Sequence, residues 1–193
     1  MKRLTSLIIA GVLSMGVALC SPEKNLQQMV QAATPITTVS SNLVQPVSYD
    51  SLDESVKKAL EFYQCSADSK YKDFTFHLDS TFSTVDNKVR FDLTAEYRGE
   101  TPFSDEVRLT YLVCGAFNRG DGWRSMCFPP PRYTTLPEKD KKPVQPGEII
   151  HQTVEITYSP ERLQNVGYLV PHVDIFFKSS DEPQTRVGVF FKK

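Results

Sequence analysis

The chain has 193 residues, of which 40% are hydrophobic and 23% charged. These values are close to the averages of globular proteins and allow one ordinary folded domain with attachments. The formal net charge is -1. A chain so nearly neutral lacks the positive surface on which nucleic-acid binding depends, so we expect no nucleic-acid partner.

The N-terminus has the pattern of an export signal. Lys2 and Arg3 precede an uncharged, largely apolar run over residues 4–19. This run is short for a membrane-spanning helix, which needs about 20 apolar residues. It fits the apolar segment of a secretory signal peptide, so the sequence predicts a signal over residues 1–20 and an exported protein.

A cysteine directly follows this apolar run. The residues Val17-Ala18-Leu19-Cys20 resemble the lipobox of bacterial lipoproteins, although Gly, Ala or Ser is usual where Leu19 stands. The resemblance implies that Cys20 carries a lipid and anchors the protein to the membrane, and Ser21 implies sorting to the outer membrane. The alternative is ordinary signal cleavage near Cys20, which would release a soluble periplasmic or secreted protein.

Residues 21–50 are rich in Ser, Thr, Gln, Ala and Pro without sustained periodicity, which predicts a flexible tether. The domain then occupies residues 51–193. Its first residues, SLDE, form a potential capping box between Ser51 and Glu54. Apolar residues follow at helical spacing, so we expect a helix over residues 52–63 whose single apolar stripe docks on the rest of the domain.

After this helix the apolar residues alternate with polar ones, which is typical of half-buried strands. Turn signals rich in Gly, Pro, Asn and Asp separate the alternating runs. Pro171 interrupts one run and predicts an edge strand or a bulge there. About seven antiparallel strands with one short helix predict a mainly β fold, a two-sheet β-sandwich of the immunoglobulin-like kind. The predicted strands occupy residues 74–82, 88–97, 106–113, 123–128, 148–158, 168–178 and 185–192.

The run CGAFNRGDGWRSMC begins with Cys114 and ends with Cys127. Gly120 and Asp121 suit the centre of a two-residue hairpin turn of type II′. Counting outward from this turn places Cys114 opposite Cys127 at a non-hydrogen-bonded pair, where the Cα atoms approach to about 4.5 Å. This separation suits a disulfide. The alternative is a disulfide between Cys65 and either of the two.

The same register gives the hairpin two apolar faces, although a sandwich strand needs only one. A second layer should therefore cover the outer face. The predicted helix over residues 52–63 is one candidate, and a partner protein with Trp123 as its anchor is the other.

The residues that could carry chemistry form no recognisable catalytic set. His77 with Asp79, and His172 with Asp174, are spaced so that each pair shares one face of a strand. Each pair could hold a metal, or could be ordinary polar alternation. The sequence contains no Gly-x-Ser-x-Gly elbow and no phosphate-binding glycine loop. We therefore expect a protein that is not an enzyme, without a metal or a cofactor.

Residues 128–148 contain six prolines and predict a long, semi-rigid, exposed connection, either a simple crossover between sheets or a binding loop. We expect an exported, non-enzymatic binding or assembly module, such as an accessory lipoprotein of a secretion, pilus or envelope complex. The alternative is a soluble binding protein such as an enzyme inhibitor. The expected contact residues are Trp123, Phe128, Pro130, Arg132 and Tyr133.

Intact mass spectrometry of the mature protein tests the signal and the cysteines together. We expect a lipid-sized increment on Cys20 and a gain of two hydrogen atoms on reduction, because an exported chain meets an oxidising compartment. A chain that begins after Cys20 without lipid would contradict the anchor. An unchanged mass on reduction would contradict the hairpin disulfide.

Overall fold

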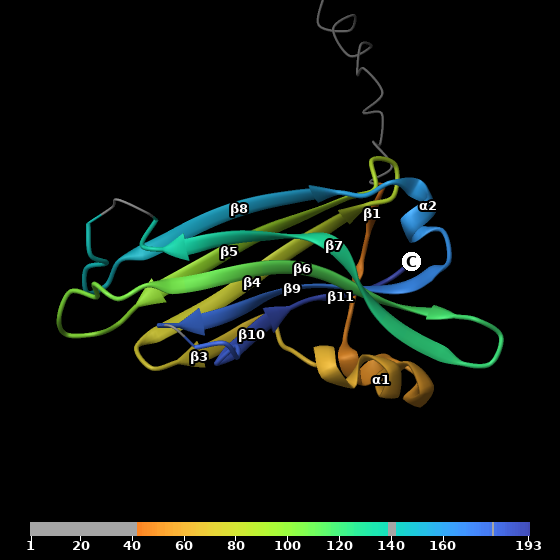
Figure 1. Cartoon of the computed structure of the whole chain (residues 1–193), viewed down its shortest axis with the longest axis horizontal. Coiled ribbons are helices and arrows are strands. Elements are labelled where there is room, and N and C mark those ends of the chain that lie inside the picture. The colour runs from red at the N-terminus through yellow and green to blue at the C-terminus, as the bar shows by residue number, and fades with distance from the viewer. Residues whose placement is uncertain (1–41, 139–141, 179) are drawn as a thin grey trace, which may run out of the picture. The chain divides into compact units, whose positions relative to one another are not determined.

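The computed structural model describes residues 42–138, 142–178 and 180–193 and shows an antiparallel two-sheet β-sandwich (Figure 1). The mainly β fold predicted from the alternating runs is confirmed. The predicted signal peptide, Cys20 and most of the predicted tether lie outside the described residues.

Sheet A has the strand order β1-β4-β5-β8, and β3 also pairs with β4. Its two long central strands, β4 and β5, pair in unbroken register from Phe74↔Tyr97 to Ser83↔Lys88. The bounds are β1 Leu43–Val44, β3 Asp68–Tyr71, β4 Phe74–Ser83, β5 Lys88–Tyr97 and β8 Ile149–Thr157.

Sheet B has the strand order β2-β11-β9-β6-β7, and β10 also pairs with β9. The described residues thus form more strands than the seven predicted, because two-residue to four-residue strands carry too little alternation to be recognised. The bounds are β2 Pro46–Val47, β6 Val107–Asn118, β7 Trp123–Leu136, β9 Val166–Phe177, β10 Thr185–Gly188 and β11 Phe190–Lys192.

The predicted helix is shorter than expected and is flanked by 3-10 turns: η1 Tyr49–Ser51, α1 Glu54–Leu60 and η2 Glu61–Tyr63. The capping-box prediction is wrong, since Asp53 is the N-cap of α1 and the Ser51 hydroxyl donates to the Ser48 carbonyl at 2.7 Å. A second short helix, α2 Pro160–Leu163, joins β8 to β9. Among the described residues no helix has the length and apolar character needed to cross a membrane.

The folded domain begins earlier than residue 51, which corrects the C-terminal boundary of the predicted tether. Leu43 and Val44 pair with β4 in sheet A, and Pro46 and Val47 pair with β11 in sheet B. This short stretch therefore contributes one strand to each sheet. Its strands are too short to show periodicity, and their partners lie far away in the sequence.

The main core lies between the sheets and consists of the inward-facing side chains of both. Phe91 of β5 and Tyr111 of β6 pack edge to face across the layers, with ring centroids 5.5 Å apart. The alternation predicted from the sequence is seen directly in β5, where every second residue is buried. The side chains on the opposite face of β5 are half-buried or exposed.

A second apolar cluster covers the outer face of sheet B. Leu52, Val56 and Leu60 pack against Ala116 of β6 and Tyr168 of β9. Figure 1 shows α1 lying beside β6, β7 and β11 on the side away from sheet A. The helix, rather than a partner protein, therefore covers this part of the outer face.

Three of the six prolines of the predicted connection, residues 129–131, lie within β7, so the prediction of a loop starting at residue 128 is wrong. The register of β6 against β7 shifts between Val113↔Phe128 and Tyr111↔Arg132. Residues 129–131, all prolines, therefore bulge opposite Leu112. Since β7 is an edge strand, the missing proline N–H groups break few ladder hydrogen bonds.

Pro171 lies in β9, a central strand, and not in an edge strand as expected. Its carbonyl accepts a hydrogen bond from the Val189 N–H at 3.0 Å, but a proline has no N–H to donate to Val189. The C-terminal residues consequently pair with β9 as two separate strands, β10 before Val189 and β11 after it.

Replacing Leu60 tests the docking of α1. Leu60 is fully buried in the second cluster, whereas the neighbouring Phe62 is 80% exposed. We expect Leu60→Ala to lower the free energy of unfolding in urea by about 2–5 kcal/mol. Phe62→Ala, the matched control, should change it by less than about 0.5 kcal/mol. Equal effects of the two variants would contradict the docking of this face.

Candidate functional site

The hairpin between β6 and β7 has the predicted turn and the predicted register. Gly120 has a φ of +90°, and the Arg119 N–H donates to the Gly122 carbonyl at 3.3 Å. Cys114 lies opposite Cys127, their Cα atoms are 3.8 Å apart, and the two form a disulfide. The separation is closer to the about 4.5 Å typical of a non-hydrogen-bonded pair than to the about 5.5 Å of a hydrogen-bonded pair, although it is shorter than both.

The disulfide also bears on the compartment of the protein. Disulfides persist in oxidising compartments and are rare in the cytosol. The Cys114–Cys127 bond therefore fits an exported location. Cys65, the alternative partner, is a free cysteine.

Trp123 packs within the protein and does not stand free as an anchor. Its ring lies edge to face with Tyr168, with centroids 5.3 Å apart, and the side chain is half-buried. A methyl group added at Gly167 would come within 2.7 Å of the Trp123 ring. The indole thus extends the apolar cluster under α1 toward the end of the hairpin.

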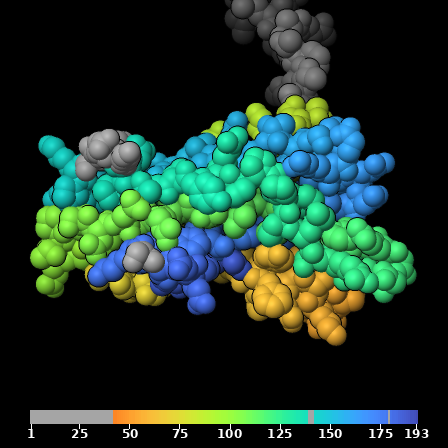
Figure 2. Space-filling model, in the orientation of Figure 1, coloured from red at the N-terminus to blue at the C-terminus, as the bar shows by residue number. Residues whose placement is uncertain are grey.

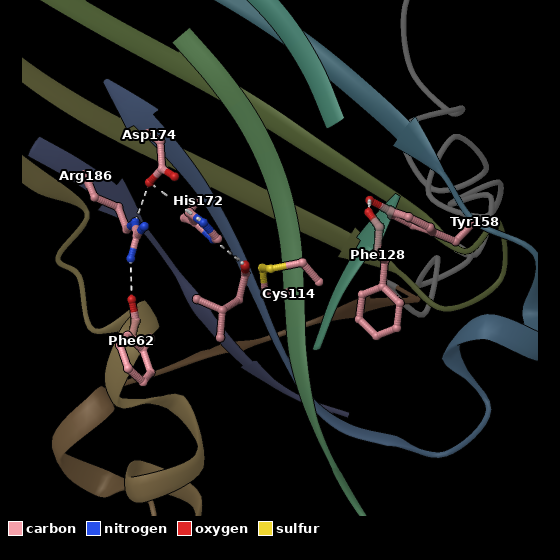
Figure 3. The surroundings of a disulfide bond; sticks show 9 residues. Phe62, Cys114, Phe128, Tyr158, His172, Asp174 and Arg186 are labelled. Carbon is pink, nitrogen blue, oxygen red and sulfur yellow. Dashed lines mark hydrogen bonds and ion pairs between the residues drawn. A yellow bond between two sulfur atoms is a disulfide. The ribbon is translucent and has the colours of Figure 1, made fainter. Parts of the chain in front are cut away.

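Phe128 does not have the exposed position that a contact residue needs, because its side chain points into the sandwich. It is 3% exposed, belongs to the main core, and packs against Tyr158 with ring centroids 6.0 Å apart (Figure 3). The sequence places Phe128 and Cys127 on opposite faces of one strand. Because the disulfide lies on the outer face, Phe128 must face inward.

The other three predicted contact residues are exposed on the edge strand β7. Pro130 lies in the bulge, and Arg132 and Tyr133 follow it. Tyr133 is 72% exposed, which is unusual for a large aromatic side chain. The structure therefore leaves Pro130, Arg132 and Tyr133 exposed on β7 and removes Phe128 from the set.

A hollow of about 460 Å³ lies beside Tyr133, on the outer face of sheet B. Its aromatic walls are Tyr133 and Phe176, and the guanidinium of Arg108 lies 5.4 Å from the centre of the Phe176 ring. Arg108 also donates to the Ser180 carbonyl at 2.5 Å. The hydroxyl and carboxyl groups come from Thr110, Thr135 and Asp181.

The two His-Asp pairs lie on different sheets. His77 is on β4 of sheet A, where Asp68 accepts from its ring at 2.7 Å and raises its pKa. His172 is on β9 of sheet B, and burial lowers its pKa. In the part of the chain that the structure describes, no group of three or more His, Cys, Asp or Glu side chains could hold a metal ion.

His172 belongs to a polar network under the end of the helix (Figure 3). Its Nδ1 is 3.1 Å from the Val170 carbonyl, and its Nε2 faces Asp174 at 3.9 Å. Arg186 of β10 bonds to Asp174 and also to the Phe62 carbonyl of η2. These contacts satisfy buried polar groups and join the helix end to sheet B, so we assign the network a structural role.

Cys65 has a free thiol with a raised pKa. Burial raises its pKa to about 12, although the positive charge of Arg186 opposes this effect. A thiol with this pKa is protonated at neutral pH, whereas a catalytic cysteine must form a thiolate. Cys65 therefore has the properties of a half-buried structural cysteine.

Gln152 of β8 is a buried polar residue that sequence reasoning missed. Its amide oxygen accepts from the Tyr111 hydroxyl at 2.9 Å and from the Thr134 hydroxyl at 2.6 Å. Its amide nitrogen donates to the Thr135 carbonyl at 3.1 Å. Gln152 thus bridges the edge strands β8 and β7 of the two sheets. Its only sequence signal is a polar residue at an inward-facing position of β8.

No protein-family model matches this chain, and no curated protein matches it. The case for a function therefore rests on the exposed side of β7, the hollow beside it and the sequence features of the N-terminus.

Alkylation of Cys65 tests whether its thiol is inert. The shift from an ordinary value of 9.0 to about 12 lowers the thiolate fraction near pH 8. Since each pKa unit changes this fraction tenfold, we expect iodoacetamide to react about a thousandfold more slowly in the native protein than in guanidinium. Equal rates in the two states would contradict the buried, protonated thiol.

Proposed function

We propose that this protein is an exported, lipid-anchored, non-enzymatic binding module that assembles with a protein partner in the bacterial envelope. The observation that carries the proposal is the hollow beside the exposed Tyr133, on the part of sheet B that α1 leaves uncovered. An exposed aromatic residue next to a hollow is a common feature of protein interfaces.

The chemistry of the hollow supports a protein partner. Tyr133 and Phe176 provide apolar ring surface, and Arg108 provides a guanidinium held over one of these rings. Tyr and Arg are enriched among the residues that contribute most to interfaces. Thr110, Thr135 and Asp181 supply hydrogen-bonding groups at the margin.

The surrounding structure supports the use of this face as a rigid platform. Tyr133 lies on β7, which is hydrogen-bonded to β6 on both sides of the proline bulge. The Gln152 side chain holds the carbonyl of the neighbouring Thr135. A contact residue on a fixed strand loses less conformational entropy on binding than one on a mobile loop.

The N-terminal sequence supports the anchoring part of the proposal. The Cys114–Cys127 disulfide fits an exported protein, and the lipobox-like residues before Cys20 provide the means of attachment. A lipid at Cys20 followed by a polar segment would hold the domain near the membrane. Envelope proteins would then be its accessible partners.

Tyr133→Ala tests the proposed face. We expect the full-length protein, cross-linked in cells and purified in mild detergent, to recover at least about tenfold less of a membrane partner than the wild type, with unchanged thermal stability. Phe62→Ala, which removes another exposed aromatic side chain, is the matched control. Equal recovery with both variants would overturn the assignment of this face.

The identity of the recovered partner distinguishes a lipid-anchored envelope module from a soluble inhibitor. A membrane protein recovered together with lipidated Cys20 supports assembly at the envelope. A soluble enzyme recovered with a chain that lacks the lipid would overturn the anchored module and support an inhibitor.

A further inference from the structure

The hairpin register shows which backbone groups of β7 point away from β6. Because Arg119 and Gly122 form the hydrogen-bonded pair next to the turn, the following pairs alternate in type. Trp123, Ser125 and Cys127 then occupy non-hydrogen-bonded positions. Their N–H and C=O groups point outward, toward the free edge of sheet B.

Further along the strand, the same edge is closed to pairing. Pro129 has no N–H, and its carbonyl accepts from Arg162 Nη1 at 2.5 Å. The Thr135 carbonyl accepts from the Gln152 side chain at 3.1 Å. Prolines and side-chain hydrogen bonds of this kind are how natural proteins prevent an edge strand from pairing.

The stretch from Trp123 to Cys127 lacks this protection. It contains no proline, and in the described residues β7 pairs with no strand except β6. Figure 2 shows this end of the hairpin projecting past α1. The disulfide at Cys127 holds the stretch in an extended conformation. Trp123, Ser125 and Cys127 therefore hold their outward N–H and C=O groups in the geometry that pairing with a further strand requires.

A second hollow, of about 530 Å³, lies between this hairpin and α2. It is lined by Phe117 and by Met126, which is 44% exposed. Arg119 and Arg162 supply two positive charges, and Glu161 supplies one negative charge. The hollow thus combines apolar surface with a net positive charge.

We propose that the edge of β7 from Trp123 to Cys127 binds an extended segment of a partner protein as an additional strand of sheet B. Side chains of the segment that share the face of Met126 enter the hollow, and they include at least one acidic residue that pairs with Arg119 or Arg162. This proposal rests on the protein being a binding module and adds the form in which the partner is recognised.

The arrangement divides affinity and specificity between two parts of the site. The outward backbone groups of Trp123, Ser125 and Cys127 form main-chain hydrogen bonds with any extended segment. The hollow selects among segments by the size and charge of alternate side chains. The opposite face of the added strand lies toward α1.

Selection from a phage-displayed library of random nine-residue peptides tests the proposal on the full-length protein in mild detergent. We expect selected peptides to alternate apolar residues with Asp or Glu and to bind as extended strands. N-methylation of the amides that face β7 should weaken a selected synthetic peptide at least tenfold, whereas N-methylation of the intervening amides should not. Failure to enrich any peptide, or equal effects of the two methylation patterns, would overturn strand addition.

Two pairs of variants test whether the peptide binds at this edge of β7 and in the neighbouring hollow. Ser125→Pro removes the central outward N–H and should weaken the peptide at least tenfold without lowering thermal stability. Ile149→Pro, at the exposed start of the other edge strand β8, should leave affinity unchanged. Arg119→Gln should weaken the binding of acidic peptides selectively, and Arg98→Gln, just after β5 of sheet A, should not. Binding insensitive to both Ser125→Pro and Arg119→Gln would overturn the assignment.

Two further outcomes are distinguishable. A dimer in sedimentation equilibrium that Ser125→Pro dissociates would overturn the heterologous partner and assign the edge to a second copy of this chain. A membrane partner that still depends on Tyr133 but not on Ser125 would overturn strand addition and leave the proposed function standing.

Discussion

The register between β6 and β7 decides which side of the longest strands enters the core. The tight turn at Gly120 and Asp121 sets this register, and the Cys114–Cys127 bond fixes it five pairs beyond the Arg119–Gly122 pair. A slip of one residue would exchange every inward side chain for an outward one. Phe128 would then leave the core, and Cys127 would no longer lie opposite Cys114.

The outer face of sheet B is divided between the protein's own helix and solvent. Over Ala116 and Tyr168, α1 buries apolar surface, and the Arg186–Asp174 pair joins the helix end to the sheet. Beyond the helix, the same face carries the hollow beside Tyr133. One face thus contributes to stability at one end and remains available for contact at the other.

Parts of the sandwich edge differ in how well they are protected from pairing with another strand. Gln152 bridges the two sheets where β7 and β8 approach each other, and the prolines prevent pairing in the middle of β7. Such devices normally protect a β protein from aggregation. The open stretch before them is short, and the Arg119 side chain beside it adds charge. In the proposed complex, this combination restricts pairing to segments that also fit the neighbouring hollow.

By itself the sequence determined the features that depend on neighbouring residues. The alternation of apolar residues predicted the sandwich, because successive side chains of a strand face opposite ways. The spacing around Gly120 predicted the pairing of Cys114 with Cys127, because a two-residue turn allows the pairs to be counted. The helical stripe predicted α1, although its N-cap is Asp53 and not Ser51.

Only the tertiary structure decided the features that depend on strands distant in the sequence. The prolines after Phe128 are compatible with a strand because β7 lies at an edge, and nothing local to them reveals this position. The burial of Gln152 follows from the approach of β8 to β7 across the sandwich. The candidate binding face is of this second kind, since its walls come from strands and loops that meet only in the folded chain.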